Sequence, residues 1–231
     1  MRALVIRTSG TNCDLEAVAA CERVGFSAER VHVRRLIERP AEVDGFQFVV
    51  VPGGFSYGDD LGAGFVHGNE IRLHLRDALV RLRDRGGLIL GICNGFQVLV
   101  RSGLLPDPAG PRGRVTLAPN ASGRFVDCWV RLEVASASPF LAGLERIELP
   151  VAHGEGRFVG SADHVALRYV DNPNGSEGDI AGICDPTGRI FGLMPHPERY
   201  VDVTNHPEWT RGVDRAPDGL RVFENAAAAL A

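Results

Sequence analysis

The first half of the chain alternates short apolar runs with longer amphipathic stretches. The apolar runs are Ala3–Ile6, Val31–Val33, Phe48–Val51 and Leu88–Ile92. Apolar runs of this length, separated by segments at helical spacing, are typical of βαβ units around a parallel sheet. The pattern predicts an α/β fold with a central, mostly parallel sheet flanked by helices.

Two of the intervening segments have the pattern of amphipathic helices. Residues 12–25 carry acidic side chains in their first turn, apolar positions at helical spacing and a glycine at their end. Residues 69–85 place Ile71, Leu75, Leu79 and Leu82 on one face, before two glycines. We interpret the opposite, arginine-rich face as solvated, with a partner-docking surface as the alternative.

The second half is richer in strand signals. Beyond Leu104 prolines and glycines are frequent, and alternating apolar and polar residues follow at Cys128–Val134 and His164–Val170. These runs predict a β-rich elaboration at the edge of the sheet. Ile180–Cys184 and Arg189–Met194 flank the turn sequence DPTG and predict a hairpin. A last helix is expected from about residue 220 to 230. No repeat or linker interrupts the pattern, so we expect one domain over residues 1–231.

Composition and charge exclude several classes of protein. The chain is 45% hydrophobic and 23% charged, as in ordinary globular proteins. Its net charge of −4 comes without a long run of like charges, so neither nucleic acid nor an anionic membrane is expected as a partner. The N-terminal apolar run is far shorter than the core of a signal peptide or a spanning helix. We therefore expect a cytoplasmic protein.

Five cysteines are present, an odd number without paired metal-binding spacing, so no metal site is expected. Cys93 has the most informative context, because it lies in the sequence GICNG between an apolar strand and a helix. This is the pattern of a nucleophile elbow, and a helix N-terminus favours the thiolate. The alternative is a buried, inert cysteine. The other four cysteines, Cys13, Cys21, Cys128 and Cys184, are interpreted as structural.

A nucleophilic thiolate needs a base, and the base needs an orienting carboxylate. His196 and Glu198 stand two residues apart in the sequence PHPE. In extended chain such residues project to the same side, so the carboxylate of Glu198 is expected to orient the imidazole. Taken alone, this short motif is a weak signal, and a surface loop would be the better interpretation of it.

The elbow and the proline-bracketed His and Glu together resemble the class I, triad-type glutamine amidotransferases, which have a flavodoxin-like fold. The resemblance implies that Cys93, His196 and Glu198 form a catalytic triad that releases ammonia from glutamine. It also implies an oxyanion hole made by backbone N–H groups at Gly53, Gly54 and Asn94. The glycine turn follows the strand Phe48–Val51, as in that family. A glycine turn without a chemical role is the alternative.

Two further assignments concern the substrate glutamine. Gln97 matches a family position that helps to hold glutamine, although a solvent-facing helical glutamine would have the same sequence. In the segment HGEGR, the glycines around Glu155 allow the backbone of Gly154 and Glu155 to approach the substrate's α-amino and carboxylate groups. An ordinary loop or a partner contact is the alternative there.

Longer segments are similar to the glutaminase subunits of phosphoribosylformylglycinamidine synthases. They are VVPGGFSYGDDLGAG (50–64), GICNGFQVL (91–99), SGRFVDCWV (122–130), AHGEGRF (152–158), NPNGSEGDIAGICD (172–185) and GLMPHPER (192–199), and the chain also carries TNCD (11–14). The resemblance implies that ammonia converts formylglycinamide ribonucleotide to the formylglycinamidine in a large synthase subunit, with a small bridging subunit in the complex. Because the chain has no G-x-x-x-x-G-K-[ST] motif, ATP and Mg are expected in the partner, and no cofactor in this chain.

Three other interpretations remain open at this point. The glutaminase subunit of imidazole glycerol phosphate synthase would use the same chemistry, but the NPNGS and HGEGR segments disfavour it. A cysteine peptidase or chaperone-like hydrolase would use an elbow cysteine without needing the late PHPE pair. A scaffold that only binds the synthase would not require all three triad residues, which this sequence retains.

Overall fold

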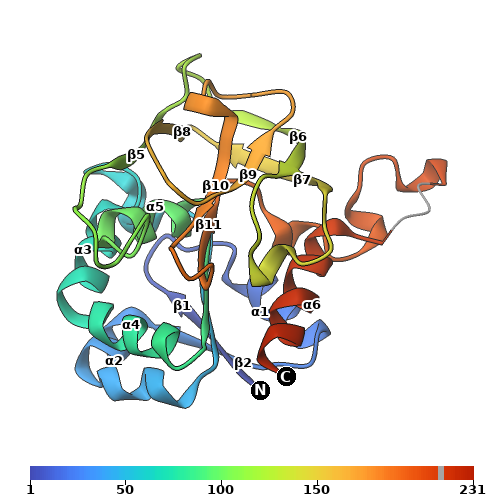
Figure 1. The fold of residues 1–231 in the computed structure, drawn as a ribbon. Coiled ribbons are helices and arrows are strands. Elements are labelled where there is room, and N and C mark those ends of the chain that lie inside the picture. Colours follow the sequence, from blue (N-terminus) through green and yellow to red (C-terminus); the bar gives the residue numbers. More distant parts are fainter. Residues whose placement is uncertain (213–215) are drawn as a thin grey trace.

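A nine-stranded sheet in the order β2-β1-β3-β4-β11-β10-β9-β6-β7 is the frame of the computed structural model, which describes residues 1–212 and 216–231 (Figure 1). The parallel half contains β1 (Arg2–Arg7), β2 (Ser27–His32), β3 (Phe48–Val51), β4 (Leu88–Ile92) and β11 (Ile190–Leu193). The antiparallel half contains β10 (Ile180–Cys184), β9 (Val165–Tyr169), β6 (Val126–Val134) and β7 (Arg146–His153). Two further strands, β5 (Val115–Pro119) and β8 (Glu155–Gly160), pair separately.

Helices cover both faces of the parallel half (Figure 1). On one face lie α1 (Asp14–Arg23) and α6 (Asp218–Leu230); on the other lie α2 (Val33–Glu38), α3 (Phe65–Glu70), α4 (Arg76–Asp84) and α5 (Asn94–Ser102). The chain runs from β1 outward to β2 and then back across β1 to β3. Because parallel crossovers are right-handed, this reversal places α1 and α2 on opposite faces.

The two layers of helices explain why the central strands have continuously apolar sequences. Every residue of β3 and β4 is buried, as expected for central parallel strands with helices on both sides. In contrast, β6 alternates between buried and exposed residues over part of its length, because the antiparallel half of the sheet is less completely covered. The expectation of an α/β fold with a mostly parallel central sheet and a β-rich edge is therefore confirmed.

The second predicted strand was placed too late in the sequence. The run Val31–Val33 marks only the end of β2, and Val33 already begins α2. β2 is an edge strand paired only with β1, so its earlier residues are partly solvent-exposed and polar. His32 ends the strand by accepting a hydrogen bond at Nδ1 from the Arg34 N–H, 3.2 Å away.

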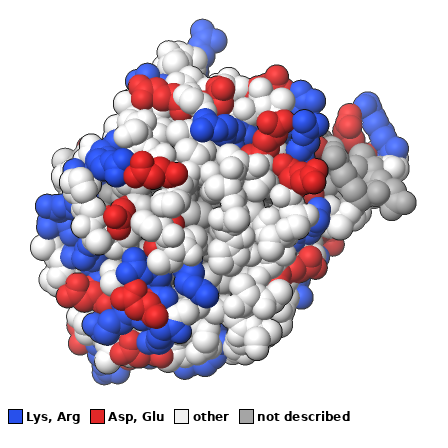
Figure 2. Space-filling view, viewed as in Figure 1, with Lys and Arg blue, Asp and Glu red and all other residues white. Residues whose placement is uncertain are grey.

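The predicted helix over residues 69–85 is longer than expected. It begins at Phe65, passes through a π-helical turn at Ile71–Leu75 and ends at Asp84. Its four predicted apolar side chains are all fully buried. On the outer face, Arg81 and Arg85 pair with Asp44 on an exposed surface; whether this face is solvated or docks a partner stays a prediction. Figure 2 shows acidic and basic side chains interleaved over this region.

The second half contains strands that the pattern did not predict. β6, β9, β10, β11 and the antiparallel pairing of β10 with β11 confirm the predicted runs and the hairpin. β5, β7 and β8 were not predicted. β7 contains Pro150, which the sequence rules disfavour within a strand, but β7 lies at the edge of the sheet, where proline is tolerated. No helix in the described ranges is long and apolar enough to cross a bilayer.

Candidate active site

Cys93 lies at a sharp turn between β4 and α5. Its backbone has φ 51° and ψ −107°, a conformation that costs energy for any residue other than glycine. The two flanking glycines are required by close packing. A Cβ at Gly95 would lie 1.8 Å from the Val51 carbonyl oxygen, and one at Gly91 would lie 2.8 Å from the Gly95 carbonyl oxygen. The strand, strained turn and helix match the predicted nucleophile elbow.

The elbow is tied to the strand beside it. The Cys93 N–H donates to the Leu193 carbonyl at the end of β11, with a distance of 2.8 Å. The Cys93 side chain is almost completely buried, and its Sγ lies 3.8 Å from the Ala152 carbonyl oxygen. The thiol is therefore held at the carboxyl edge of the parallel sheet, where α/β proteins place their ligands.

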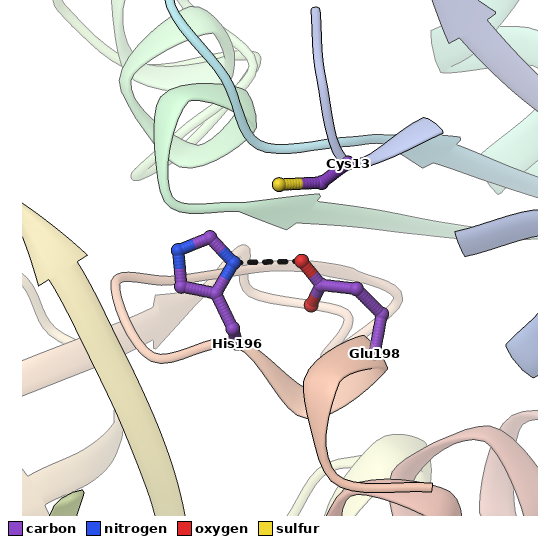
Figure 3. Close-up of side chains that lie close together, drawn as sticks. All are labelled: Cys13, His196 and Glu198. Atoms are coloured by element: carbon purple, nitrogen blue, oxygen red, sulfur yellow. Dashed lines mark hydrogen bonds and ion pairs between the residues drawn. The ribbon is translucent and has the colours of Figure 1, made fainter. Parts of the chain in front are cut away.

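His196 and Glu198 form the buried pair that the sequence predicted. The imidazole Nδ1 lies 2.6 Å from Glu198 Oε1, and both residues are only 2% exposed. Figure 3 shows the ring nitrogen facing the carboxylate. The local geometry differs from the extended chain that was expected. His196 is extended, but Pro197–Arg199 forms a 3₁₀ turn that brings Glu198 back toward the ring.

Electrostatics favour a protonated imidazole in this setting. Burial alone would lower the pKa of His196, but the Glu198 carboxylate and the nearby thiols of Cys93 and Cys13 raise it well above its ordinary value. His196 Nε2 has no hydrogen-bond partner among the described residues, so this nitrogen is free to bond a reacting group. An oriented imidazole with one free nitrogen is the arrangement of a general acid and base.

Cys13, interpreted from the sequence as structural, lies in the same site. Its sulfur lies within 4.8 Å of a ring nitrogen of His196 and a carboxylate oxygen of Glu198, and Figure 3 shows it beside the imidazole. Arg199 Nη2 is 3.1 Å from the Cys13 sulfur, while burial raises the pKa of this thiol. The positive charge of Arg199 and the His196–Glu198 bond favour acid–base chemistry here over metal binding. Cys128, also interpreted as structural, is exposed, so it is not a core residue.

Topology is the signal that would have identified Cys13. It follows β1, as Cys93 follows β4 and His196 follows β11, and these strands are parallel. The carboxyl ends of parallel strands meet at one edge of the sheet, so residues after them converge. Strand order was needed to use this rule, and the sequence pattern did not provide it.

Of the residues expected in the oxyanion hole, Gly54 lines the cavities at Cys93, Gly53 lies against His196 and Cys13, and Asn94 directly follows Cys93. Gly54 lines two adjacent cavities that both include Cys93. A Cβ at Gly53 would lie 2.8 Å from His196 Cε1, so only glycine fits beside the imidazole. Asn94 begins α5, where the first N–H groups have no partner within the helix. The geometry is compatible with backbone donors near the sulfur.

A cavity of about 180 Å³ beside Cys93 contains the residues expected to hold glutamine. Gln97, Gly154 and Glu155 all line it. Gln97 is buried rather than solvent-facing; its amide donates to the Glu155 carbonyl at 2.7 Å and accepts from Asn94 Nδ2 at 3.0 Å. Asp59, Phe125 and His153 also line the cavity and were not predicted.

Comparisons with known proteins agree with this geometry. A family model described as a CobB/CobQ-like glutamine amidotransferase domain matches residues 1–228. The protein named phosphoribosylformylglycinamidine synthase subunit PurQ of Dehalococcoides mccartyi is 46% identical, with 98% of this chain and 96% of the relative covered. The protein of the same name from Thermotoga maritima is 41% identical, covering 97% and 95%.

Solved structures give the same result. A chain in the structure of PurLQS from Thermotoga maritima matches with a TM-score of 0.83 and 37% identity, over 100% of this chain and 99% of that one. A glutamine amidotransferase from Thermotoga maritima matches with a TM-score of 0.56 at 18% identity, over 99% of this chain and 96% of that one, which supports the fold alone.

Proposed function

The chain belongs to the family of phosphoribosylformylglycinamidine synthase PurQ subunits, and from this membership we propose that it hydrolyses the side-chain amide of L-glutamine and supplies the ammonia to a synthase partner. The observation that carries the proposal is the buried 2.6 Å contact between His196 and Glu198 beside a cysteine on a nucleophile elbow. Nucleophile, base and orienting carboxylate are the components of covalent amide hydrolysis.

The reaction follows from the roles of these groups. The Cys93 thiolate attacks the carboxamide carbon of glutamine, and the resulting oxyanion accepts hydrogen bonds from backbone N–H groups of the Gly53–Gly54 turn and Asn94. Protonated His196 donates its proton to the departing ammonia, which leaves a glutamyl thioester on Cys93. His196 then removes a proton from water, the water attacks the thioester, and glutamate is released.

The acceptor of the ammonia lies on another polypeptide in this proposal. The T. maritima structure that matches this chain is named PurLQS, and the relatives are named as synthase subunits. We assign to this chain two partners: a large synthase subunit, which binds ATP and Mg, and a small bridging subunit. Phe55 and Phe125 are half exposed and line both cavities at Cys93, so a partner seated there would exclude water. We place the complex in the cytoplasm and treat residues 1–231 as one domain.

The test separates ammonia generation from ammonia use. Cys93→Ala in the assembled complex is expected to abolish glutamine-dependent synthesis, while synthesis from high ammonium salt continues at the wild-type rate. Only the first reaction needs the thiolate. A glutamine-like alkylating agent is expected to label Cys93, with peptide mapping by mass spectrometry as the second measurement.

Cys21→Ala serves as the matched control, because this cysteine is buried in the core away from the site. It is expected to retain both activities. Equal loss of the glutamine and ammonium activities in Cys93→Ala would contradict the proposal, and so would labelling of Cys13 in place of Cys93.

A further inference from the structure

We propose that Asp59 and Glu155 form the binding site for the α-ammonium group of the substrate glutamine, with His153 as a third acceptor. This inference rests on the proposed glutaminase function and names the residues that recognise its substrate. All three residues line the cavity of about 180 Å³ that also contains Cys93. The site therefore lies beside the sulfur that attacks the other end of the same substrate.

Two consecutive backbone N–H groups hold the carboxylates side by side. The Ala63 N–H donates to Glu155 Oε2, and the Gly64 N–H donates to Asp59 Oδ1, each at 3.3 Å. Asn94 Nδ2 also donates to Asp59 Oδ1, at 3.3 Å, which connects the carboxylate to the helix that begins after Cys93. Asp59 is placed by an unusual backbone conformation with φ 55°.

Each carboxylate keeps one oxygen without a donor. Within residues 1–212 and 216–231, neither Asp59 Oδ2 nor Glu155 Oε1 receives a hydrogen bond, and neither side chain has an ion-pair partner. Burial raises the pKa of Asp59, and the nearby Glu155 charge raises it further. Two close carboxylates without a cation are a costly arrangement that a bound positive charge would relieve.

His153 supplies an independent observation. It is 3% exposed, and its Nε2 has no hydrogen-bond partner among the described residues. Asn120 Nδ2 donates to the Arg124 and His153 carbonyls, so the Asn120 Oδ1 must be the acceptor of His153 Nδ1–H. Burial lowers the pKa of His153 to about 4, so the ring is neutral and Nε2 is an unprotonated, unsatisfied acceptor.

These three side chains present acceptors only: two carboxylates and an imidazole nitrogen. A group bound by them must bring donors and a positive charge, which an ammonium group does. The α-ammonium of glutamine and the ammonium released by the reaction share this chemistry. We assign the site to the α-ammonium, because the carboxylates would otherwise trap the product beside the nucleophile.

The test compares glutamine with glutaramate, the analogue in which hydrogen replaces the α-amino group. Both are assayed for amide hydrolysis by the complex containing wild-type, Asp59→Asn, Glu155→Gln or Asp60→Asn chains. Asp60 is the matched control, because it is adjacent in sequence and exposed. Removing one charge-assisted contact is expected to lower kcat/KM for glutamine by about ten- to a hundredfold, mainly through KM. Hydrolysis of glutaramate should not change.

Loss on glutamine alone, in both site variants and not in the control, supports the proposal. Equal losses on both substrates would assign the carboxylates a structural role and overturn it, as would unchanged kinetics. A normal KM with less nucleotide product per glutamine consumed would assign the site to released ammonium and also overturn it. If the wild-type complex hydrolyses neither substrate, the proposed function itself is wrong.

Discussion

At the scale of single residues, the protonation state of His196 depends on the carboxylate of Glu198. His196 is buried, and burial disfavours a charged imidazole. Glu198 reverses this effect through a 2.6 Å contact and raises the pKa of His196 well above its ordinary value. The proton that must reach the leaving ammonia is therefore present on the ring near neutral pH.

Glu198→Gln is expected to lower the pKa of His196, because the desolvation remains while the attraction to a negative charge is lost. Less of the enzyme then carries the imidazolium at neutral pH, so the alkaline limb of kcat/KM for glutamine moves to lower pH. The variant should therefore lose activity at pH 8 relative to the wild type. The pH profile of the variant is measured from pH 5 to 9.

Glu145→Gln removes an exposed carboxylate and is expected to keep the wild-type profile. A Glu198→Gln enzyme with the wild-type profile would show that the carboxylate does not control the base.

Residues near in sequence were easier to predict than residues brought together by topology. The motif PHPE placed His196 and Glu198 in contact, and the structure confirms that contact. Cys13 and Asp59 come from loops after different strands, and only the strand order places them near Cys93. A cysteine or an aspartate in a loop does not by itself indicate that the residue belongs to the site. The catalytic roles of all these residues remain predictions.

At the scale of elements, glycines set the distances between the helices and strands of the site. α5 packs so closely on the end of β3 that a Cβ at Gly95 would lie 1.8 Å from the Val51 carbonyl oxygen. α3 approaches α5 at Gly68, where a Cβ would lie 2.5 Å from Arg101 Cβ. The position of α5, the helix that begins after Cys93, thus depends on the absence of a side chain at Gly68 and Gly95.

Gly95→Ala is expected to destabilise the protein, although alanine is the better helix former by about 1 kcal/mol. The added methyl group meets rigid backbone, so α5 must shift away from β3. We expect a net loss of about 2 kcal/mol or more in the free energy of unfolding, measured by urea denaturation. Gly154→Ala is the control, since its nearest new contact is 3.8 Å away. Equal stability of the two variants would contradict this account of the packing.

Central elements were predicted well and peripheral ones poorly, for a physical reason. β3 and β4 are buried on both faces, so their sequences are continuously apolar. β2 and β7 are edge strands that keep polar residues or a proline, and the pattern misplaced the first and missed the second. Strand signals weaken where one side of the strand faces water.

At the scale of the whole molecule, the oxyanion hole depends on a peptide that other parts of the chain hold. The Gly53 carbonyl accepts from the N–H groups of Asn12 and Cys13, at 3.4 and 3.3 Å. In a trans peptide the Gly54 N–H points opposite to this carbonyl. A partner that moves the loop before α1 would therefore also turn the Gly54 N–H.

We expect low glutaminase activity from the isolated chain and higher activity when the large synthase partner and its nucleotide substrate are bound. One misdirected oxyanion donor costs about 3 kcal/mol, or roughly a hundredfold in rate. Steady-state glutamine hydrolysis is compared for the chain alone, with the partner, and with partner and nucleotides. Equal rates in all three would mean that the site is already organised in the free chain.

The position of β11 has a consequence for how the enzyme is made. β11 lies between β4 and β10, and Ile89 pairs with Ile190, far along the chain. During synthesis on the ribosome, β4 therefore has one unpaired edge until β11 has emerged. Such distant pairings form slowly, and open strand edges invite aggregation. The same delay keeps a nascent chain from hydrolysing glutamine, because the base, His196, follows β11 in the sequence and is therefore synthesised late.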